Sequence, residues 1–216
     1  MVYNLSDSPG IHQVFLAGLR SRDLQQNRSV FRKNMERLGQ ILAYEISRSI
    51  PYKEEAVHTP LGTATHRVPA ETPVLCCILR AGIPFFNGFL DYFNESDAGF
   101  FGAYRGSSRD DHSFDIQLDY EALPAMEGKT IILIDPMLAT GKSMLKAAEV
   151  IMSKNQPQKL IIASLISSPE GIACLQSGLP ESDIWTIAID EGLNSHAYIM
   201  PGLGDAGDLS FGSKLG

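Results

Sequence analysis

Short apolar runs separated by helical stretches constrain the fold of this chain more than any other feature of its sequence. The runs are rich in Ile, Val and Leu, show no polar/apolar alternation, and cover Val74–Leu79, Thr130–Ile134, 159–166 and 184–189. Strands that are buried on both faces have this composition. Helical patterns lie after two of them, at 143–153 and 170–176. The alternation predicts an α/β fold with a doubly wound parallel sheet and right-handed crossovers.

The rest of the chain adds a helix and an arm to this sheet. An amphipathic helix is expected over 29–49, because apolar residues recur there at helical spacing, namely Phe31, Met35, Leu38, Leu42 and Ile46. Residues 52–73 are rich in Thr, Gly, Pro and Ala and predict a small β-arm outside the main sheet. The long polar segment 105–123 is predicted to be the part that moves. With 216 residues the chain can bury one substantial core, so a single domain over 1–216 is expected.

Composition excludes several classes of partner. The net charge of −7 argues against a nucleic acid bound across a broad surface, which would need a basic face. No stretch is apolar enough over the length that a membrane span requires, and the first residues lack the pattern of a secretory signal. The cysteines Cys76, Cys77 and Cys174 cannot all pair, so we expect reduced thiols and a cytoplasmic protein.

The strand Thr130–Ile134 runs directly into a loop at 135–143, and a helix is predicted to follow it. The unpaired N–H groups and the dipole at a helix N-terminus favour a phosphate at such a junction. A nucleoside-triphosphate loop would need glycine where this chain has Pro136, which supplies no N–H group. The loop therefore suits one phosphate monoester. Asp135 could accept hydrogen bonds from ribose hydroxyls, or it could simply cap the turn.

These residues closely resemble the phosphoribosyl-pyrophosphate loop of uracil phosphoribosyltransferases. Most phosphoribosyltransferases have two adjacent acidic residues at this point, whereas Asp-Pro-Met is similar to the uracil branch. The resemblance implies that Asp135 contacts the ribose and that the following residues wrap the 5-phosphate of the substrate 5-phospho-α-D-ribose 1-diphosphate (PRPP). The implied PRPP-binding residues of this phosphate loop are Asp135, Pro136, Met137, Leu138, Ala139, Thr140, Gly141, Lys142 and Ser143.

Two arginines are candidates for binding the pyrophosphate group. Arg80 ends the strand Val74–Leu79 and precedes small residues, so its guanidinium could fork onto an anion or form a surface salt bridge. The segment around Arg80 is similar to the pyrophosphate-binding segment of the same family, which implies a strained or cis peptide bond there. Arg105 matches the second arginine of the family pattern. The resemblance thus implies that Arg80 and Arg105 bind PRPP and stabilise the departing pyrophosphate.

The segment 198–208, here called the base loop, is the most specific stretch of the chain. It reads Tyr-Ile-Met-Pro-Gly-Leu-Gly-Asp-Ala-Gly-Asp. Its glycines satisfy a dinucleotide-binding pattern, but no helix is predicted after them and no second strand follows. The loop resembles the uracil-binding signature of the family, which implies that Ile199, Gly204, Asp205 and Ala206 surround the base. Asp205 is also implied to bind PRPP near the ribosyl carbon and to act with the two arginines in catalysis. A glycine-rich tail without a ligand is the alternative.

Together these motifs imply a type I phosphoribosyltransferase fold in which residues 190–216 form a C-terminal hood over the base. The implied reaction converts uracil and PRPP to UMP and diphosphate. Mg²⁺ is the implied cofactor, held mainly by PRPP, with water contacts to Asp135 or Asp205 and no certain protein ligand. The expected assembly is a homodimer or a higher homo-oligomer, with no nucleic-acid or membrane partner.

Two alternatives stay open at this point. The chain could be a regulatory protein that senses UMP or uracil without turnover, or a phosphoribosyltransferase for another base. Lys142, Leu209 and the segment 110–123 depart from the family pattern. These departures concern the phosphate loop, the residue after the base loop and the segment predicted to move.

Overall fold

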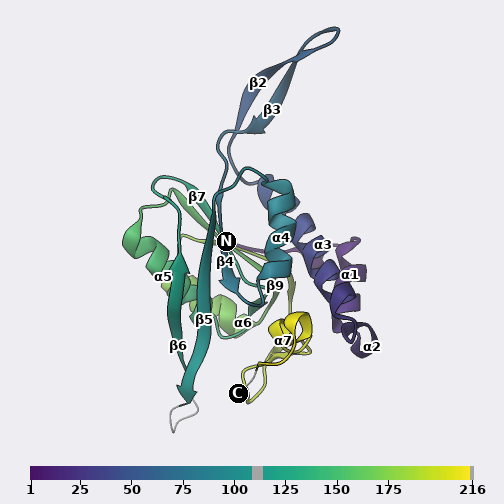
Figure 1. The fold of residues 1–216 in the computed structure, drawn as a ribbon, viewed down its shortest axis with the longest axis vertical. Helices are drawn as coiled ribbons and strands as arrows, with labels where there is room; N and C mark the ends of the chain where they lie inside the picture. The colour runs from purple at the N-terminus through teal and green to yellow at the C-terminus, as the bar shows by residue number, and fades with distance from the viewer. Residues whose placement is uncertain (109–113, 215–216) are drawn as a thin grey trace.

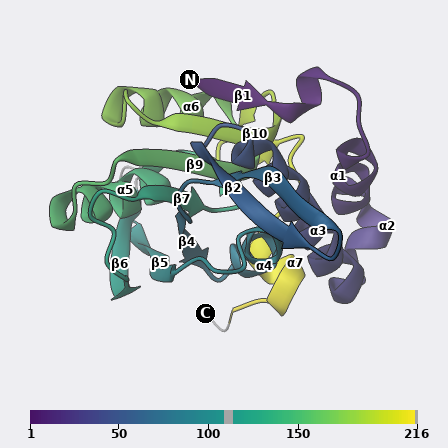
Figure 2. The same cartoon turned by 90° about the horizontal axis from the view of Figure 1, so that it is seen from above.

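A mainly parallel sheet lies at the centre of the molecule, with helices on both faces (Figures 1 and 2). The computed structural model describes residues 1–108 and 114–214, and for 103–108 and 114–117 the backbone only. The strand order is β1-β10-β9-β7-β4-β5-β6, and each neighbouring pair is parallel except β5 and β6. The strands are β1 (Val2–Asn4), β10 (Asp183–Ile189), β9 (Lys159–Ser167), β7 (Thr130–Ile134), β4 (Val74–Leu79), β5 (Ala98–Ser108) and β6 (Phe114–Ala122). The α/β fold with a doubly wound parallel sheet is confirmed.

Two hydrophobic clusters fill the two faces of this sheet. One face is covered by α1 (His12–Arg20), α3 (Arg28–Ser47) and α4 (Ile83–Tyr92), and the other by α5 (Lys142–Lys154) and α6 (Pro169–Gly178). Figure 1 shows the first group to the right of the sheet and α5 to its left. Residues alternate between the clusters along a strand, because successive side chains point to opposite faces. In β7, Ile132 and Ile134 belong to the first cluster and Ile131 and Leu133 to the second. Burial on both faces explains why these strands show no polar alternation.

The predicted amphipathic helix is α3, which follows α1 and the short α2 (Arg22–Gln25). Its apolar residues are buried as the spacing predicted, namely Phe31, Met35, Leu38, Leu42 and Ile46. Helix α4 packs directly on it through two glycines. A Cβ on Gly39 would lie 2.1 Å from the carbonyl oxygen of Phe85, and one on Gly88 would lie 2.1 Å from that of Glu36. The two helices can approach this closely only because neither residue has a side chain.

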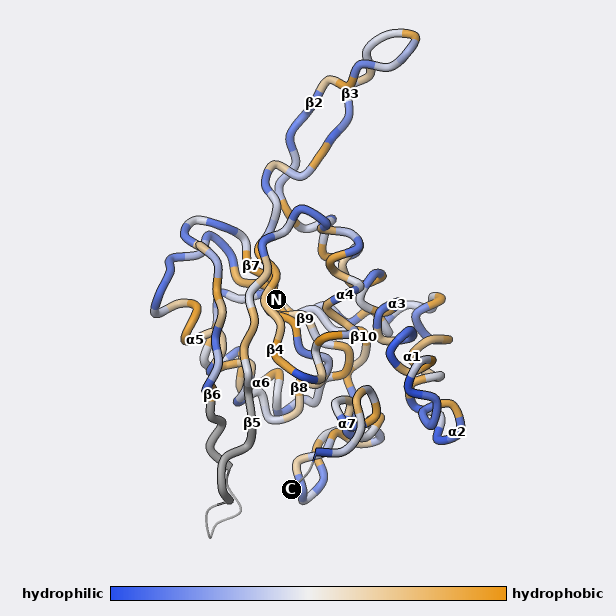
Figure 3. The backbone as a smooth tube through the Cα atoms, viewed as in Figure 1, coloured by the Kyte–Doolittle hydropathy of each residue, from blue (hydrophilic) through white to orange (hydrophobic). Residues whose placement is uncertain are grey.

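The predicted arm is an antiparallel hairpin of β2 (Tyr52–Thr59) and β3 (Gly62–Pro69), paired separately from the main sheet. It projects from one end of the molecule (Figure 1). Its residues are mostly exposed, including Tyr52 and Val57, and hydrophilic and hydrophobic positions both occur along it (Figure 3). The arm therefore contributes little to the hydrophobic core.

The polar segment 105–123, predicted above only as the part that moves, has regular structure over most of its length. Most of it belongs to β5 and β6, which pair antiparallel with two irregularities in register. Apolar and polar residues alternate strictly from Phe114 to Glu121, which is the pattern of a strand and outweighs the polar composition. The residues between the two strands lie outside the described part of the chain, and the predicted movement stays a prediction.

The hood leaves the sheet after β10 and returns over the carboxyl ends of the strands. It contains β11 (Gly192–Leu193), β12 (Ile199–Met200) and α7 (Ala206–Phe211). The last is the yellow helix near the end of α4 in Figure 1, and it packs on α3, where Arg32 Nη1 donates to the carbonyl oxygen of Ser210 at 2.7 Å. The prediction that no helix follows the glycines was wrong. The helix is six residues long, and a segment this short contains too few apolar residues to show a helical period.

Within the described residues, no helix combines the length and the apolar character that a membrane crossing requires.

Candidate active site

The carboxyl ends of β4 and β7 and the hood enclose a cavity of about 700 Å³. This is the edge at which doubly wound sheets bind their ligands. Most of the predicted site residues line it. Those residues are Arg80, Asp135, Met137, Leu138, Ala139, Thr140, Gly141, Ser143, Ile199, Gly204, Asp205 and Ala206. The tertiary structure thus brings together three motifs that are far apart in the sequence.

The phosphate loop connects β7 to the first turn of α5. Gly141 is the residue before the helix and has φ +78°, a conformation that favours glycine. A Cβ there would lie 2.8 Å from the carbonyl oxygen of Gly171 and 2.9 Å from the Cβ of Cys174. Thr140 and Ser143 lie at the cavity wall beside the helix N-terminus. N–H groups and hydroxyl groups at such a helix N-terminus suit one anion.

Helix α6 supports this loop through residues that do not line the cavity. Ser168, the N-cap of α6, donates from Oγ to the carbonyl oxygen of Ala139 at 2.6 Å and accepts from the N–H of Gly171 at 2.9 Å. The N–H of Ser168 donates to the carbonyl oxygen of Leu138 at 2.9 Å. Sequence reasoning missed Ser168, although a serine before Pro-Glu-Gly is an N-cap signal.

Two predicted PRPP-binding residues do not line the cavity as the described residues define it. Pro136 is buried, and its carbonyl oxygen accepts hydrogen bonds from the N–H groups of Leu165 and Ile166. Lys142 is exposed. Pro136 thus lies where β7 ends, between β7 and the short strand β8 (Met137–Leu138). Strand β8 pairs with β9.

Asp135 lies half-buried at the end of β7 and faces the cavity. Burial raises the pKa of its carboxyl group to about 7, although a hydrogen bond from the N–H of Met137, at 3.2 Å, opposes this shift. Burial raises the pKa of the neighbouring Cys77 thiol well above its usual range, and the charge of Asp135 adds to that effect. Asp135 therefore titrates near neutral pH, while Cys77 stays a neutral thiol.

Arg80 reaches from the end of β4 to the hood. The peptide bond between Leu79 and Arg80 is cis, as the resemblance implied. Arg80 Nη2 donates to Asp208 Oδ1 at 3.2 Å and to the carbonyl oxygen of Gly212 at 3.0 Å. Its buried Nε has no hydrogen-bond partner among the described residues. Such a donor at a cavity wall is available to an anionic ligand. Arg105 lies in β5, and its side chain is outside the described part of the structure.

The base loop has an irregular backbone that glycine makes possible. Gly202 and Gly204 have φ +62° and +94°, and the peptide bond before Pro201 is cis. Asp205 caps α7, and its Oδ1 accepts from the N–H of Asp208 at 2.9 Å. A Cβ on Gly207 would lie 3.8 Å from the Cβ of Ala81, so the hood passes close to the segment that carries Arg80. Residues of the base loop and of the phosphate loop thus line the same cavity.

Further residues line the cavity without having been predicted. Ala197 and Tyr198 precede Ile199, and Lys214 brings a cation from the end of the described chain. No group of three or more His, Cys, Asp or Glu side chains that could hold a metal occurs in the described part of the structure. Nothing in the sequence around Lys214 points to a ligand, so only the return of the hood over the sheet reveals its position.

The family model for uracil phosphoribosyltransferase matches residues 11–213, which is nearly the whole chain. The chain belongs to the uracil phosphoribosyltransferase family. Relatives with that name include a protein of Porphyromonas gingivalis, 44% identical over 202 residues and 93% of each chain. Another, from Thermococcus gammatolerans, is 33% identical over 217 residues, which cover 99% of this chain and 94% of the relative. The family consists of pentosyltransferases, and the family predicted from the sequence motifs is confirmed.

Solved structures agree with this assignment. The AQ2163 protein from Aquifex aeolicus is similar with a TM-score of 0.89, at 31% identity and with 98% of each chain covered. A hypoxanthine phosphoribosyltransferase from Staphylococcus aureus has a TM-score of 0.50 at 13% identity, covering 75% of this chain and 76% of that one. The second likeness concerns the fold alone, and it confirms the expected type I phosphoribosyltransferase fold.

Proposed function

We propose that this uracil phosphoribosyltransferase family member transfers the phosphoribosyl group of PRPP to N1 of uracil, giving UMP and diphosphate. The observation that carries the proposal is the shared cavity, where the phosphate loop, Arg80 and the base loop meet. A phosphate site, a pyrophosphate site and a base site around one cavity would match the 5-phosphate and pyrophosphate groups of PRPP and the uracil base.

In the proposed reaction, the bond from the anomeric carbon to the pyrophosphate oxygen breaks and a bond to uracil N1 forms. The phosphate loop holds the 5-phosphate, and Asp135 accepts hydrogen bonds from the ribose hydroxyls. Arg80 and Arg105 stabilise the negative charge that develops on the departing pyrophosphate. Asp205 polarises the N1–H group of uracil or accepts its proton. Most of the rate acceleration comes from holding the two substrates in line while charge develops.

Mg²⁺ is the proposed cofactor. The residues present fit a metal that is held mainly by PRPP, since Asp135 and Asp205 offer carboxylate oxygens at the cavity while the described side chains form no metal cluster. When bound, Mg²⁺ would neutralise charge on the pyrophosphate and help it to leave. Asp135 and Asp205 would hold waters of the ion.

Uracil is proposed to be recognised through the backbone of Ile199, Gly204, Asp205 and Ala206. An edge of uracil presents acceptor, donor and acceptor groups, which peptide N–H and C=O groups complement. Cytosine would place an amino group against a backbone donor. A site of this kind rejects the wrong base by roughly 10⁴-fold, because buried polar groups would go unpaired.

We also propose that residues 1–216 act as one domain, in a homodimer or a higher homo-oligomer in the cytoplasm. The exposed arm supports the assembly, because a projecting hairpin with exposed Tyr52 and Val57 can bury these side chains only against another chain. The free cysteines of the described chain suit a reducing compartment.

The test is release of diphosphate from PRPP and Mg²⁺ with uracil, cytosine, hypoxanthine or no base. Turnover with uracil alone is the expected result. Turnover with hypoxanthine would indicate a phosphoribosyltransferase for another base. Silence with every base, together with tight binding of UMP in calorimetry, would contradict the enzymatic proposal and indicate a sensor of UMP.

A further inference from the structure

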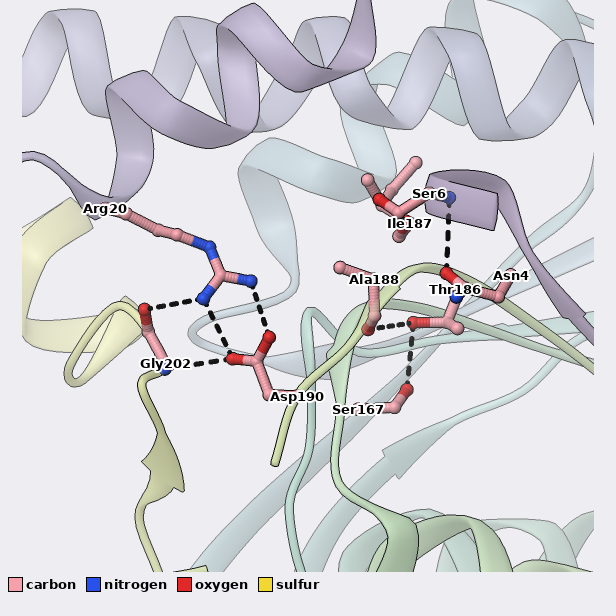
Figure 4. A network of polar contacts seen from close by, with 9 residues as sticks. All are labelled: Asn4, Ser6, Arg20, Ser167, Thr186, Ile187, Ala188, Asp190 and Gly202. Carbon is pink, nitrogen blue, oxygen red and sulfur yellow. Dashed lines mark hydrogen bonds and ion pairs between the residues drawn. The ribbon is translucent and has the colours of Figure 1, made fainter. Parts of the chain in front are cut away.

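An ion pair lies behind the base loop and holds it at one glycine (Figure 4). Arg20, at the end of α1, donates from Nη2 to Asp190 Oδ1 at 2.6 Å and from Nη1 to Asp190 Oδ2 at 3.0 Å. Asp190 Oδ2 also accepts from the N–H of Gly202 at 2.9 Å, and the carbonyl oxygen of Gly202 accepts from Arg20 Nη1 at 3.3 Å. Both backbone polar groups of Gly202 are therefore held by the same two side chains.

This pair is partly buried and is fixed to the sheet. The side chain of Asp190 is 5% exposed and that of Arg20 is 23% exposed. Asp190 directly follows β10, and its N–H donates to the carbonyl oxygen of Ser167 at 2.8 Å. A two-pronged contact between guanidinium and carboxylate fixes orientation as well as distance. The position of Gly202 is thus tied to the carboxyl ends of β9 and β10.

A second contact from the same part of the chain holds the next residue. Gln25 Nε2 donates to the carbonyl oxygen of Leu203 at 2.8 Å and to that of Leu19 at 2.8 Å. Helices α1 and α2 therefore anchor consecutive peptide groups of the base loop.

The anchored residues lie between residues that line the cavity. Ile199 and Gly204 are cavity residues, whereas Gly202 and Leu203 are held by contacts outside it. The turn between them is tight, since a Cβ on Gly202 would lie 2.1 Å from the carbonyl oxygen of Ile199. Glycine itself offers no side chain to fix the turn. The external contacts therefore decide where the peptide groups of Gly204 and Asp205 stand, and a shift of about 1 Å is enough to impair a site of this kind.

We propose that Arg20 and Asp190 are positioning residues that set the affinity of the base loop for the pyrimidine. The inference rests on the proposed function, because it assigns the base to this loop. Neither residue contacts the phosphate loop or Arg80, so the pair acts mainly on the base, whereas PRPP keeps those other contacts and is affected less.

The experiment compares Asp190→Asn, Arg20→Lys and Arg20→Gln with the wild-type chain. Asparagine keeps the volume of Asp190 but replaces one acceptor oxygen by an NH₂ donor. This donor then faces a donor group of Arg20 or Gly202, so at least one hydrogen bond is lost. Lysine keeps the charge of Arg20 but cannot contact both carboxylate oxygens and Gly202 in the same fork geometry. Arg20→Lys also keeps the test valid if a variant with an unpaired buried charge fails to fold.

Asp183→Asn is the matched control. Asp183 begins β10, the strand that Asp190 follows, and its side chain is 11% exposed. Its carboxylate contacts the amino group of Met1 at 3.0 Å and Lys159 Nζ at 2.8 Å. The control therefore removes a comparable buried carboxylate from the other end of the strand, away from the base loop.

Each chain is measured for the KM of uracil, the KM of PRPP, and hydrogen exchange at the Gly202 amide. The three variants are expected to raise the KM of uracil about 10-fold to 100-fold and to speed exchange at Gly202 by a similar factor, while the KM of PRPP changes less than about 3-fold. Arg20→Lys should have the smallest effect, and Asp183→Asn should change none of these quantities. Equal rises in both KM values, or an unchanged KM of uracil, would overturn the inference.

The proposed function and this inference can fail separately. If the wild-type chain does not turn over uracil, the proposed function fails, and the affinity for UMP in calorimetry then takes the place of the KM. Weaker UMP binding in the Arg20 variants but not in Asp183→Asn would still support the inference. Unchanged UMP affinity, or a wild-type chain that binds no UMP, would overturn it.

Discussion

Ser168 Oγ donates a hydrogen bond of 2.6 Å to the carbonyl oxygen of Ala139, which joins the first turn of α6 to the phosphate loop. The same oxygen accepts from the N–H of Gly171 at 2.9 Å. A Cβ on Gly171 would lie 2.4 Å from that carbonyl oxygen of Ala139, so the loop and the helix touch through their backbones. The phosphate loop therefore depends for its shape on α6 as well as on α5, the helix that directly follows the loop.

Replacing Ser168 by Ala should loosen the phosphate loop. The variant removes an N-cap and leaves the carbonyl group of Ala139 with one donor fewer, which costs about 1–2 kcal/mol of unfolding free energy. The KM of PRPP should rise about 3-fold to 10-fold, with the KM of uracil nearly unchanged. Denaturant unfolding and steady-state kinetics check this. Ser182→Ala is the control, since Ser182 Oγ donates to the carbonyl oxygen of Leu179 away from the cavity. An equal effect of both variants on the KM of PRPP would contradict the prediction.

Replacing Gly141 by Ala should cost more stability than replacing Gly128. Both glycines have positive φ values, +78° and +66°, so both substitutions strain the backbone by about 1 kcal/mol. Only at Gly141 would the new Cβ meet other atoms, because nothing lies within 4 Å of a Cβ at Gly128. The difference between the two losses in unfolding free energy should be about 1–3 kcal/mol. Equal losses would mean that α6 moves aside without resistance.

Asp135 should make both activity and stability depend on pH. Its folded-state pKa of about 7 lies above that of a free aspartate, so the folded chain holds a proton that the unfolded chain has lost between about pH 4 and 7. Stability contributed by the protonated carboxyl group is thus complete below about pH 4 and is lost as the pH rises to about 7. Asp135→Asn should remove this slope in unfolding experiments.

The kinetics should move in the opposite direction with pH. The ribose hydroxyls need the ionised carboxylate as acceptor, so kcat/KM for PRPP should rise to a plateau with a midpoint at about pH 7. In Asp135→Asn this step should disappear and the plateau should be lower. A step that persists in the variant would assign the titration to another group.

Replacing Arg80 by Gln should lower kcat about 100-fold to 1000-fold, as expected for the loss of a charge that stabilises the leaving pyrophosphate. The same change also breaks the contacts of Arg80 Nη2 with Asp208 and Gly212. Asp208→Asn separates the two effects, because it removes the ion pair and keeps the guanidinium. That control should lower kcat by less than about 10-fold, since the pair is partly exposed. Similar losses in both variants would indicate that Arg80 acts mainly by holding the hood.

Shortening the arm should change the assembly without changing the fold. A variant in which residues 53–68 are replaced by a short glycine turn should keep its far-UV circular dichroism apart from the loss of one hairpin. Its molar mass in light scattering should fall to that of a smaller assembly, because most arm residues are exposed and none belongs to the hydrophobic core of the described residues. An unchanged mass would show that another surface makes the oligomer.

Contiguous motifs were predictable because each carries its own physical reason. The loop 135–143 follows a strand and precedes a helix, so its anion site depends on neighbours in the chain. The apolar runs predicted β4, β7, β9 and β10 because strands buried on both faces need such residues. The strand β6 carried an equally clear alternation, and the polar composition around it concealed that signal.

The sequence by itself determined the central sheet, the phosphate loop and the glycines that allow the base loop to turn. Only the tertiary structure decided which side chains support these elements. Arg20 and Asp190 are 170 positions apart, and Ser168 lies 29 positions from Ala139. Propensity and period act over a few residues, whereas a hydrogen bond across such distances exists only once packing has brought the helices to the carboxyl ends of the strands.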